Sequence, residues 1–241
     1  MKPNIICFLT VHPCEKFYIF CKKLKNVNYD IYICIDDDNY VIPNYDKIIP
    51  IIKINKKICE NAGFKSSVLW LNNTACSRDK ALYYFCKNNI DYNFLWLIED
   101  DVFIPKIDTI KNIDIKYKNN DLLCSGNDII YEKQTGWHWD HINSQIKIPP
   151  PYSTSMICAI RISKKLLACI KNYVKKYNNL FMDEALFTTL ALQANLDVVN
   201  PIELSTILYR NEWQIWDIKK EYLYHPIKDI NLQYKYRKQL I

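Results

Sequence analysis

Residues 96–103 read "WLIEDDVF", an apolar run that ends in three consecutive carboxylates, Glu99, Asp100 and Asp101. Adjacent like charges repel, and their burial is costly unless a positive group lies beside them. A second acidic triplet, at 36–38, closes the apolar run "YDIYICI". Both runs have the continuous apolar character of buried strands. The repeated layout predicts that the two acidic strand ends share one purpose.

Short apolar runs alternate with amphipathic segments along the chain. The runs predict strands over 5–11, 32–35, 47–54, 94–98, 122–125 and 156–160, and helical spacing predicts helices over 15–25, 77–88, 164–176 and 183–193. Continuous apolar strands that alternate with helices are typical of an α/β fold, with a mostly parallel central sheet flanked by helices. In such sheets ligands bind beyond the carboxyl ends of the strands, where both acidic triplets lie.

The composition favours one globular unit. The chain has 241 residues, of which 49% are hydrophobic, enough for a sizeable core. No repeat or low-complexity linker divides it, so we expect a single domain over 1–241. The aromatic and charged segment after Pro201 is expected to wrap around that domain.

Several classes of function are disfavoured by the composition. With only 3 glycines the chain has no Gly-rich phosphate loop, and the lysines behind the net charge of +6 are scattered rather than clustered, which disfavours a nucleic-acid platform. No apolar run approaches the ~18 residues of a membrane span, and the first residues do not form a signal peptide. We therefore expect no nucleic-acid partner and no membrane span.

The cysteines bear on the cellular compartment of the protein, and its amino-acid composition bears on its source. None of the 10 cysteines forms a C-x-x-C pair, and several lie inside apolar runs, so we expect reduced thiols and a cytoplasmic protein. Heavy use of Asn, Lys, Ile and Tyr is typical of an AT-rich genome, such as that of a large DNA virus, a protist parasite or an AT-rich bacterium. A viral protein would occupy the host cytoplasm.

Carboxylates gathered at a strand end are the ligands that Mg²⁺ or Mn²⁺ requires. These cations take oxygen ligands, commonly one or two protein carboxylates with phosphate oxygens completing the shell. The alternative is a solvated acidic loop. That alternative carries more weight for 36–38 than for 99–101, because the second triplet is flanked by apolar residues on both sides.

The two acidic strand ends, about sixty residues apart, resemble those of the GT-A glycosyltransferases, which use nucleotide sugars. The resemblance implies a single GT-A, Rossmann-like domain with a nucleotide-binding half over 1–105, and an acceptor half with the wrapping tail over 106–241. It further implies a nucleoside-diphosphate sugar as donor, with a UDP-sugar favoured. The implied cofactor is Mn²⁺ or Mg²⁺, and the acceptor is a glycan, a glycoprotein or a small molecule.

The resemblance also assigns roles to the acidic residues. The first strand end would contact the base or ribose through Asp36, Asp37 or Asp38. In the second, Asp101 would bind the metal, while Glu99 or Asp100 would face the ribose or the donor sugar.

Two basic segments fit the same family. "CSRDKAL" places Arg78 and Lys80 at the start of a helix, where similar residues meet the donor or steady the acidic motif; a solvated helix start is the alternative. "YLYHPIKD" resembles the late histidine segment that closes the metal shell. His225 would then bind the metal and Lys228 would meet the diphosphate, whereas a purely structural histidine is the alternative.

The candidate catalytic base lies in "FMDEALFTTL", which resembles a segment of several inverting members. Asp183 and Glu184 begin a predicted helix, and Glu184 is the favoured base. That branch of the family usually lacks the acidic strand-end motif, so the match is incomplete and inversion is only favoured. The alternative is that the helix dipole alone accounts for carboxylates at this position.

The loop "TGWHWDHI" is the candidate acceptor site. Trp137, His138 and Trp139 would contact the acceptor, since indole rings stack on the flat faces of sugars. His138 and His141 have a spacing that can hold zinc, but no Cys pair or third ligand is near in sequence. The remaining alternative is an aromatic cover for the core.

Two other classes of protein share these features. A metal-dependent nucleotidyltransferase could use both triplets for two metal ions, but it would need neither the His-Pro segment nor the Asp-Glu helix start. A non-catalytic nucleotide- or sugar-binding module would need neither an intact triplet nor a base.

Overall fold

The computed structural model describes residues 3–25, 29–44, 47–68, 73–136 and 138–240. The strands are β1 (Asn4–Thr10), β2 (Tyr29–Ile35), β3 (Ile51–Ile52), β4 (Phe94–Glu99), β5 (Leu122–Ile130), β6 (Tyr152–Ser163) and β7 (Val198–Val199). The α-helices are α1 (Glu15–Lys25), α2 (Lys56–Asn61), α3 (Ser77–Lys87), α4 (Thr109–Lys116), α5 (Trp139–Gln145), α6 (Lys164–Tyr177), α7 (Asp183–Gln193) and α8 (Ile230–Gln239), with 3-10 turns at Ile202–Leu204 and Ile215–Asp217.

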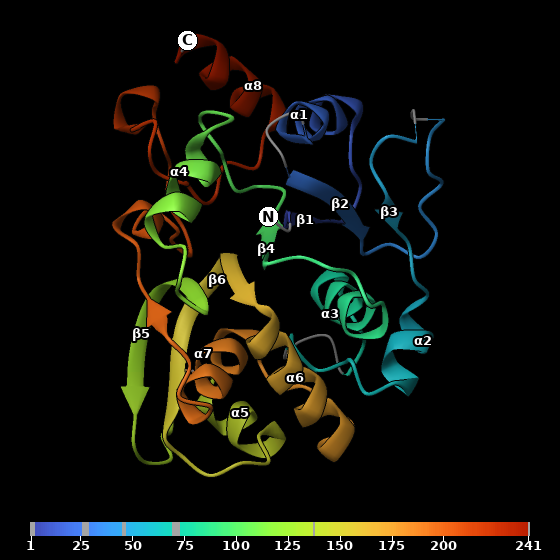
Figure 1. Ribbon diagram of the computed structural model, residues 1–241, viewed down its shortest axis with the longest axis vertical. Helices are drawn as coiled ribbons and strands as arrows, with labels where there is room; N and C mark the ends of the chain where they lie inside the picture. Colours follow the sequence, from blue (N-terminus) through green and yellow to red (C-terminus); the bar gives the residue numbers. More distant parts are fainter. Residues whose placement is uncertain (1–2, 26–28, 45–46, 69–72, 137, 241) are drawn as a thin grey trace.

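All seven strands form one sheet in the order β3-β2-β1-β4-β6-β5-β7 (Figure 1). Only β6 runs against its neighbours: it is antiparallel to β4 and to β5, whereas the remaining pairs are parallel. The expected α/β class, with a mostly parallel sheet flanked by helices, is therefore confirmed. This layout is Rossmann-like.

Alternation along the strands divides the core between the two faces of the sheet. Ile5 and Cys7 of β1 pack with α2, α3, α5, α6 and α7, while Ile6 and Phe8 pack with α1 and α4. Successive side chains of a strand point to opposite faces, so a strand covered on both faces must be apolar throughout. That requirement explains the unbroken apolar runs from which the strands were predicted.

Several elements differ from those expected. The strand predicted over 47–54 is reduced to the two residues of β3, and helices α2, α4, α5 and α8 were not predicted. These helices are short and bury only part of one face, so their apolar spacing is weak. The segment after Pro201 ends in α8, which begins after the N-cap residue Asp229 and lies beside α1 (Figure 1).

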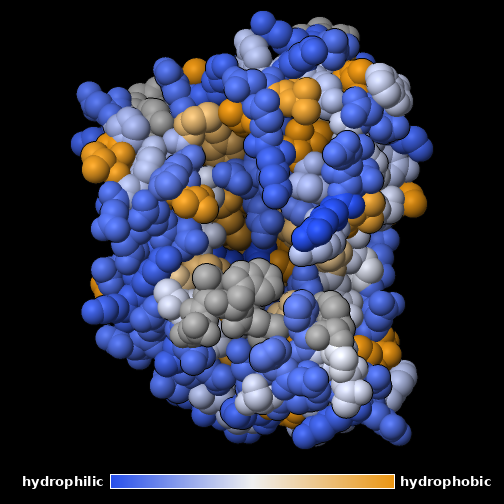
Figure 2. All heavy atoms as spheres, turned by 180° about the vertical axis from the view of Figure 1, so that it is seen from behind, coloured by the Kyte–Doolittle hydropathy of each residue, from blue (hydrophilic) through white to orange (hydrophobic). Residues whose placement is uncertain are grey.

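The surface is consistent with a globular protein. The face in Figure 2 is mostly hydrophilic, with scattered hydrophobic residues and a hollow near its middle. Within the described residues, no helix combines the length and the apolar character needed to cross a membrane. All ten cysteines are free thiols, as expected.

A buried ion pair lies away from the acidic strand ends. Arg161 of β6 is fully buried and donates to Oδ1 of Asp114 at 2.8 Å, and the same carboxylate accepts hydrogen bonds from Trp96, Asn4 and Tyr29. The carboxylate therefore joins α4 to strands β1, β2, β4 and β6. Such a pair is costly to break, because the remaining charge stays buried without compensation.

Replacement of Asp114 by Ala is expected to lower the free energy of unfolding by about 3–5 kcal/mol, because it leaves the buried Arg161 guanidinium without its carboxylate partner. The measurement is chemical denaturation of the variant and of a control, Lys164→Ala, whose exposed ion pair with Asp91 contributes at most about 1 kcal/mol. Equal stabilities of the two variants would show that the buried pair does not hold the sheet to α4.

Candidate active site

Three strand ends meet at one edge of the sheet. β1 ends at Thr10, and its carbonyl accepts a 2.8 Å hydrogen bond from the backbone N–H of Asp36, just past the end of β2. On the other side of β1, the N–H of Asp100 donates to the carbonyl of Leu9 at 3.0 Å. The two acidic triplets therefore lie on either side of the end of β1, as the parallel register requires.

Lys80 neutralises the first triplet. Its side chain is fully buried, and its ammonium donates to Oδ1 of Asp38 at 2.7 Å and to the carbonyl of Asp36 at 2.6 Å. Burial raises the pKa of Asp38, but the hydrogen bonds from Lys80 and from the backbone N–H of Lys56, with the charges of both lysines, together lower it by more, so the net shift is downward. Lys56 adds a second cation 3.3 Å from Asp36. Lys80 thus steadies the acidic motif, the second of its two expected roles, and is too deeply buried to meet a donor.

Arg78 plays the same part for the second triplet. Its guanidinium is buried and donates to Oε1 of Glu99 at 2.7 Å, to Asp183 at the start of α7, and to the carbonyl of Ile157 at 3.3 Å. Strand β4, strand β6 and helix α7 therefore meet on one side chain. Arg78 therefore holds Glu99 and Asp183 in place, which corresponds to the second of its two expected roles, steadying the acidic motif; its expected contact with a donor stays a prediction.

Asp100 turns away from its two acidic neighbours. Its carboxylate accepts a hydrogen bond from the hydroxyl of Thr10, and its carbonyl accepts one from Nε2 of Gln233 at 3.0 Å. Burial raises the pKa of Asp100, and the bond from Thr10 opposes that shift. In this structure the side chain ties β4 to β1, so the expected contact of Asp100 with the donor requires that bond to open.

His225 lies beside the second triplet although more than a hundred residues separate them in sequence. Its Nε2 is 3.4 Å from Oδ1 of Asp101 and 3.8 Å from Oε2 of Glu99. The backbone explains the approach, since the N–H of Ile227 donates to the carbonyl of Asp101 at 2.8 Å. The proximity of His225 to Asp101 is as the sequence analysis expected.

The ligand atoms around His225 fit a divalent cation. Nδ1 lies 2.5 Å from the carbonyl of Leu208 and must donate to it, so in a neutral ring Nε2 presents its lone pair to Glu99 and Asp101. Among the described residues, none donates a hydrogen bond to the buried Oδ1 of Asp101. Burial lowers the pKa of His225, but the Asp101 carboxylate, the hydrogen bond to the carbonyl of Leu208 and the charge of Glu99 together raise it by more. Carboxylate oxygens of Glu99 and Asp101 thus lie close to Nε2 of His225.

Cys158 joins this cluster and was not predicted as a site residue. One ligand atom each from Glu99, Cys158 and His225 lie within 4.8 Å of one another. The pairing of Ile98 with Ala159, extended by one residue, places Cys158 opposite Glu99 across the β4–β6 ladder. Only the strand register carries this signal, because the sequence around Cys158 reads as an ordinary apolar strand.

The two carboxylates at the start of α7 have different surroundings. Asp183 is buried and bonded to Arg78, whereas Glu184 is partly exposed. Burial raises the pKa of Glu184 to about 7, with Asp183 and Glu99 adding to the shift and Arg78 opposing it. Glu184 is therefore the carboxylate of this pair that is free to exchange a proton near neutral pH.

The remaining candidates lie outside this cluster. Lys228 is exposed on the segment that follows His225. Trp139 is buried and stacks on Tyr152 with ring centroids 5.9 Å apart, so for this residue the aromatic-cover alternative holds and the expected sugar-stacking role does not. His138 is partly buried at the start of α5, and Trp137 lies outside the described residues.

Among the described residues, no third metal-ligating side chain joins His138 and His141, whose H-x-x-H spacing suggested a zinc site. In the part of the chain that the structure describes, the one group of three or more metal-ligating side chains is Glu99, Cys158 and His225. His138 and His141 belong to no such group.

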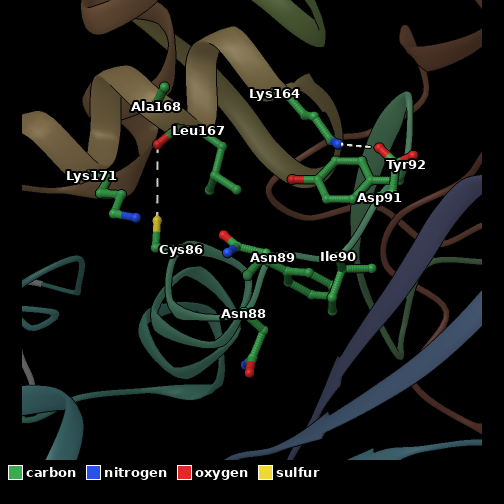
Figure 3. A pocket seen from close by; sticks show the side chains of 11 residues that line it. Cys86, Asn88, Asn89, Ile90, Asp91, Tyr92, Lys164, Leu167, Ala168 and Lys171 are labelled. Carbon is green, nitrogen blue, oxygen red and sulfur yellow. Dashed lines mark hydrogen bonds and ion pairs between the residues drawn. The ribbon is translucent and has the colours of Figure 1, made fainter.

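A cavity of about 470 Å³ lies between the end of α3 and the first turns of α6 (Figure 3). Its lining includes Asn88, Lys164 and Lys171, but none of the acidic strand-end residues. Lys164 follows Ser163, which pairs with Phe94 at the start of β4, so this cavity lies at the opposite edge of the sheet from Glu99. It is separate from the candidate active site.

No family model and no curated protein matches the chain. Among solved structures, it is similar to a galactosyltransferase, LgtC, in complex with donor and acceptor sugar analogues, with a TM-score of 0.48 and 12% identity over 98% of this chain and 95% of that one. It is also similar to a 4-diphosphocytidyl-2C-methyl-D-erythritol synthase from Anaerococcus prevotii (TM-score 0.43, 11% identity, 82% and 89% covered) and to mouse xyloside xylosyltransferase 1 (TM-score 0.39, 9% identity, 83% and 85% covered).

Replacement of Arg78 by Met is expected to cost about 3–5 kcal/mol of unfolding free energy, because the buried carboxylate of Asp183 would lose its partner and the partly exposed Glu99 would lose its ion pair. The measurement is urea denaturation without added metal. The control is a triple variant that also carries Glu99→Gln and Asp183→Asn, which removes all three charges and should recover part of the loss. A triple variant no more stable than the single one would contradict the charge argument.

Proposed function

We propose that this protein is a metal-dependent glycosyltransferase that moves a sugar from a nucleoside-diphosphate sugar, a UDP-sugar, to an acceptor hydroxyl. The observation that carries the proposal is the convergence of Glu99, Asp101 and His225 Nε2 at the carboxyl edge of a mostly parallel sheet. Ligands of such sheets bind at that edge. The proton-exchanging carboxylate of Glu184 supplies the second requirement, a base beside the donor site.

Donor binding divides between the two acidic ends. Asp37 and Asp38, already oriented by His12 and Lys80, would accept hydrogen bonds from the base or ribose. Asp101 and His225 would hold Mn²⁺ or Mg²⁺, which neutralises charge on the leaving diphosphate. Lys228, exposed beyond His225, would add a second positive charge to the diphosphate.

Glu184 is the proposed base. Its carboxylate takes the proton of the acceptor hydroxyl as that oxygen bonds to the anomeric carbon, and the bond from that carbon to the diphosphate oxygen breaks. The electron pair leaves with the nucleoside diphosphate, so a single displacement inverts the configuration. A pKa of about 7 suits this task, because the base is ionised near neutral pH and still accepts a proton readily.

A two-metal nucleotidyltransferase has less support. It would need the first triplet as a second cation site, yet Lys80 and Lys56 already lie 2.7 Å and 3.3 Å from its carboxylates. Protein cations in these positions repel a metal ion. The surroundings of Asp36 and Asp38 therefore favour one metal site rather than two.

Replacement of Asp101 by Ala is expected to abolish Mn²⁺-dependent binding of UDP, because the carboxylate is a proposed metal ligand. Isothermal titration with UDP, with and without Mn²⁺, measures the effect. Asp108→Ala serves as the control, since it removes an exposed carboxylate seven residues further along. Metal-dependent UDP binding that is unchanged in Asp101→Ala would remove Asp101 from the metal site.

Replacement of Glu184 by Gln is expected to lower the transfer rate by ~10²–10⁴ while the affinity for the UDP-sugar stays unchanged. The assay is UDP release over a panel of UDP-sugars and glycan, glycoprotein and small-molecule acceptors. In the wild type, kcat should rise with pH through about 7, because the base must be deprotonated and its pKa is raised to about 7. In Glu184→Gln this rise of kcat with pH should be absent.

Two results would count against this role. Loss of UDP-sugar affinity together with turnover would assign Glu184 to the donor instead. Full activity in Glu184→Gln would move the base elsewhere, and retention of the anomeric configuration in the product would exclude a single displacement.

A further inference from the structure

Cys158 lies where a soft ligand meets the proposed metal site. Across the β4–β6 ladder it faces Glu99, and directly opposed side chains of an antiparallel pair lie on the same face about 4.5–5.5 Å apart. Its sulfur, a carboxylate oxygen of Glu99 and a ring nitrogen of His225 lie within 4.8 Å of one another. None of the roles proposed above uses this thiol.

The surroundings of Cys158 differ from those of two other buried cysteines, Cys7 and Cys124. Cys7 lies mid-strand in the apolar core, and the thiol of Cys124 donates to the carbonyl of Gly126 at 3.3 Å. Cys158 instead has the carboxylates of Glu99 and Asp101 as neighbours, and burial, followed by the Glu99 charge, raises the pKa of its thiol. Packing alone does not require a thiol beside these charged groups.

We propose that Cys158, Glu99 and His225 form a mixed thiolate–carboxylate–imidazole site that binds a borderline divalent metal, Zn²⁺ or Co²⁺, through a metal–sulfur bond. The inference rests on the metal site of the proposed function and changes its ligand set and metal preference. As the metal–sulfur bond forms, the thiol proton passes to solvent. Three protein ligands leave an open position for a water or a phosphate oxygen, as in catalytic zinc sites.

The ligand set determines which ions the site prefers. Sulfur and imidazole ligands favour Zn²⁺ and Co²⁺, whereas Mg²⁺ requires oxygen ligands, and Mn²⁺ binds such sets more weakly than Co²⁺. We therefore expect affinity to decrease in the order Zn²⁺, Co²⁺, Mn²⁺, Mg²⁺. Asp101, 3.4 Å from the imidazole, is placed to take the open position when no water or phosphate oxygen fills it, and as an oxygen ligand it would leave that order unchanged.

The test is the absorption spectrum of the full chain titrated with Co²⁺ alone, without nucleotide. A thiolate-to-Co²⁺ charge-transfer band in the near ultraviolet is expected to saturate at one equivalent and to disappear when Zn²⁺ is added. Cys158→Ser should lose the band and bind Zn²⁺ at least ~10-fold more weakly. Two controls should keep it: Cys124→Ser, on the opposite face of the sheet, and Cys14→Ser, which removes the exposed thiol.

X-ray absorption at the zinc edge of the wild type gives a reading that does not depend on any variant folding. One sulfur at about 2.3 Å from Zn²⁺ is expected. A shell of nitrogen and oxygen only, absence of the Co²⁺ band in the wild type, or a band that persists in Cys158→Ser would each overturn the inference. If the protein transfers sugar with Mn²⁺ but shows no zinc–sulfur shell, this inference is wrong and the proposed transferase function is retained. If it shows a zinc–sulfur shell but transfers no sugar, the proposed function is wrong and this inference is retained.

Discussion

The buried guanidinium of Arg78 is the contact on which the rest of the site depends. It links the end of β4, the start of α7 and the carbonyl of Ile157 in β6, and it places a positive charge beside Glu99 and beside the buried carboxylate of Asp183. Once those two carboxylates are fixed, Glu184 is held beside them by its own backbone bond to Asp183. Acidic strand end and candidate base are thus placed by one side chain.

The two acidic triplets differ because their counter-charges differ. Lys80 and Lys56 neutralise the first, which leaves it suited to hydrogen bonding with an uncharged ribose or base. The second has a single full cation, Arg78, set against Glu99, Asp101 and Asp183, with His225 as a titratable neighbour. An excess of negative charge therefore lies on the β4 side, and this asymmetry favours the metal site that we propose at Asp101 over one at Asp36.

The strands that end at the two acidic triplets could be predicted from local sequence alone. An apolar run followed by Glu99–Asp101 can be recognised without information on distant residues. The position of His225 followed from a family resemblance and agrees with the structure. The roles of Arg78 and Lys80 as internal counter-ions, and the presence of Cys158, depend on strand register and on contacts between residues up to 105 positions apart, which sequence spacing does not encode. Trp139 was misjudged because a tryptophan in a polar loop gives no sign of the Tyr152 ring beneath it.

The contacts of residues 225–233 also have a consequence for biosynthesis. His225, Ile227 and Gln233 all bond or approach the segment 99–101, which leaves the ribosome more than a hundred residues earlier. Until they emerge, the nascent sheet presents the carboxylates of Glu99 and Asp101 without the imidazole and without the backbone bond at Asp101. Domains fold largely as units during synthesis. The cluster of Glu99, Asp101 and His225 accordingly takes shape only after residues 225–233 have emerged.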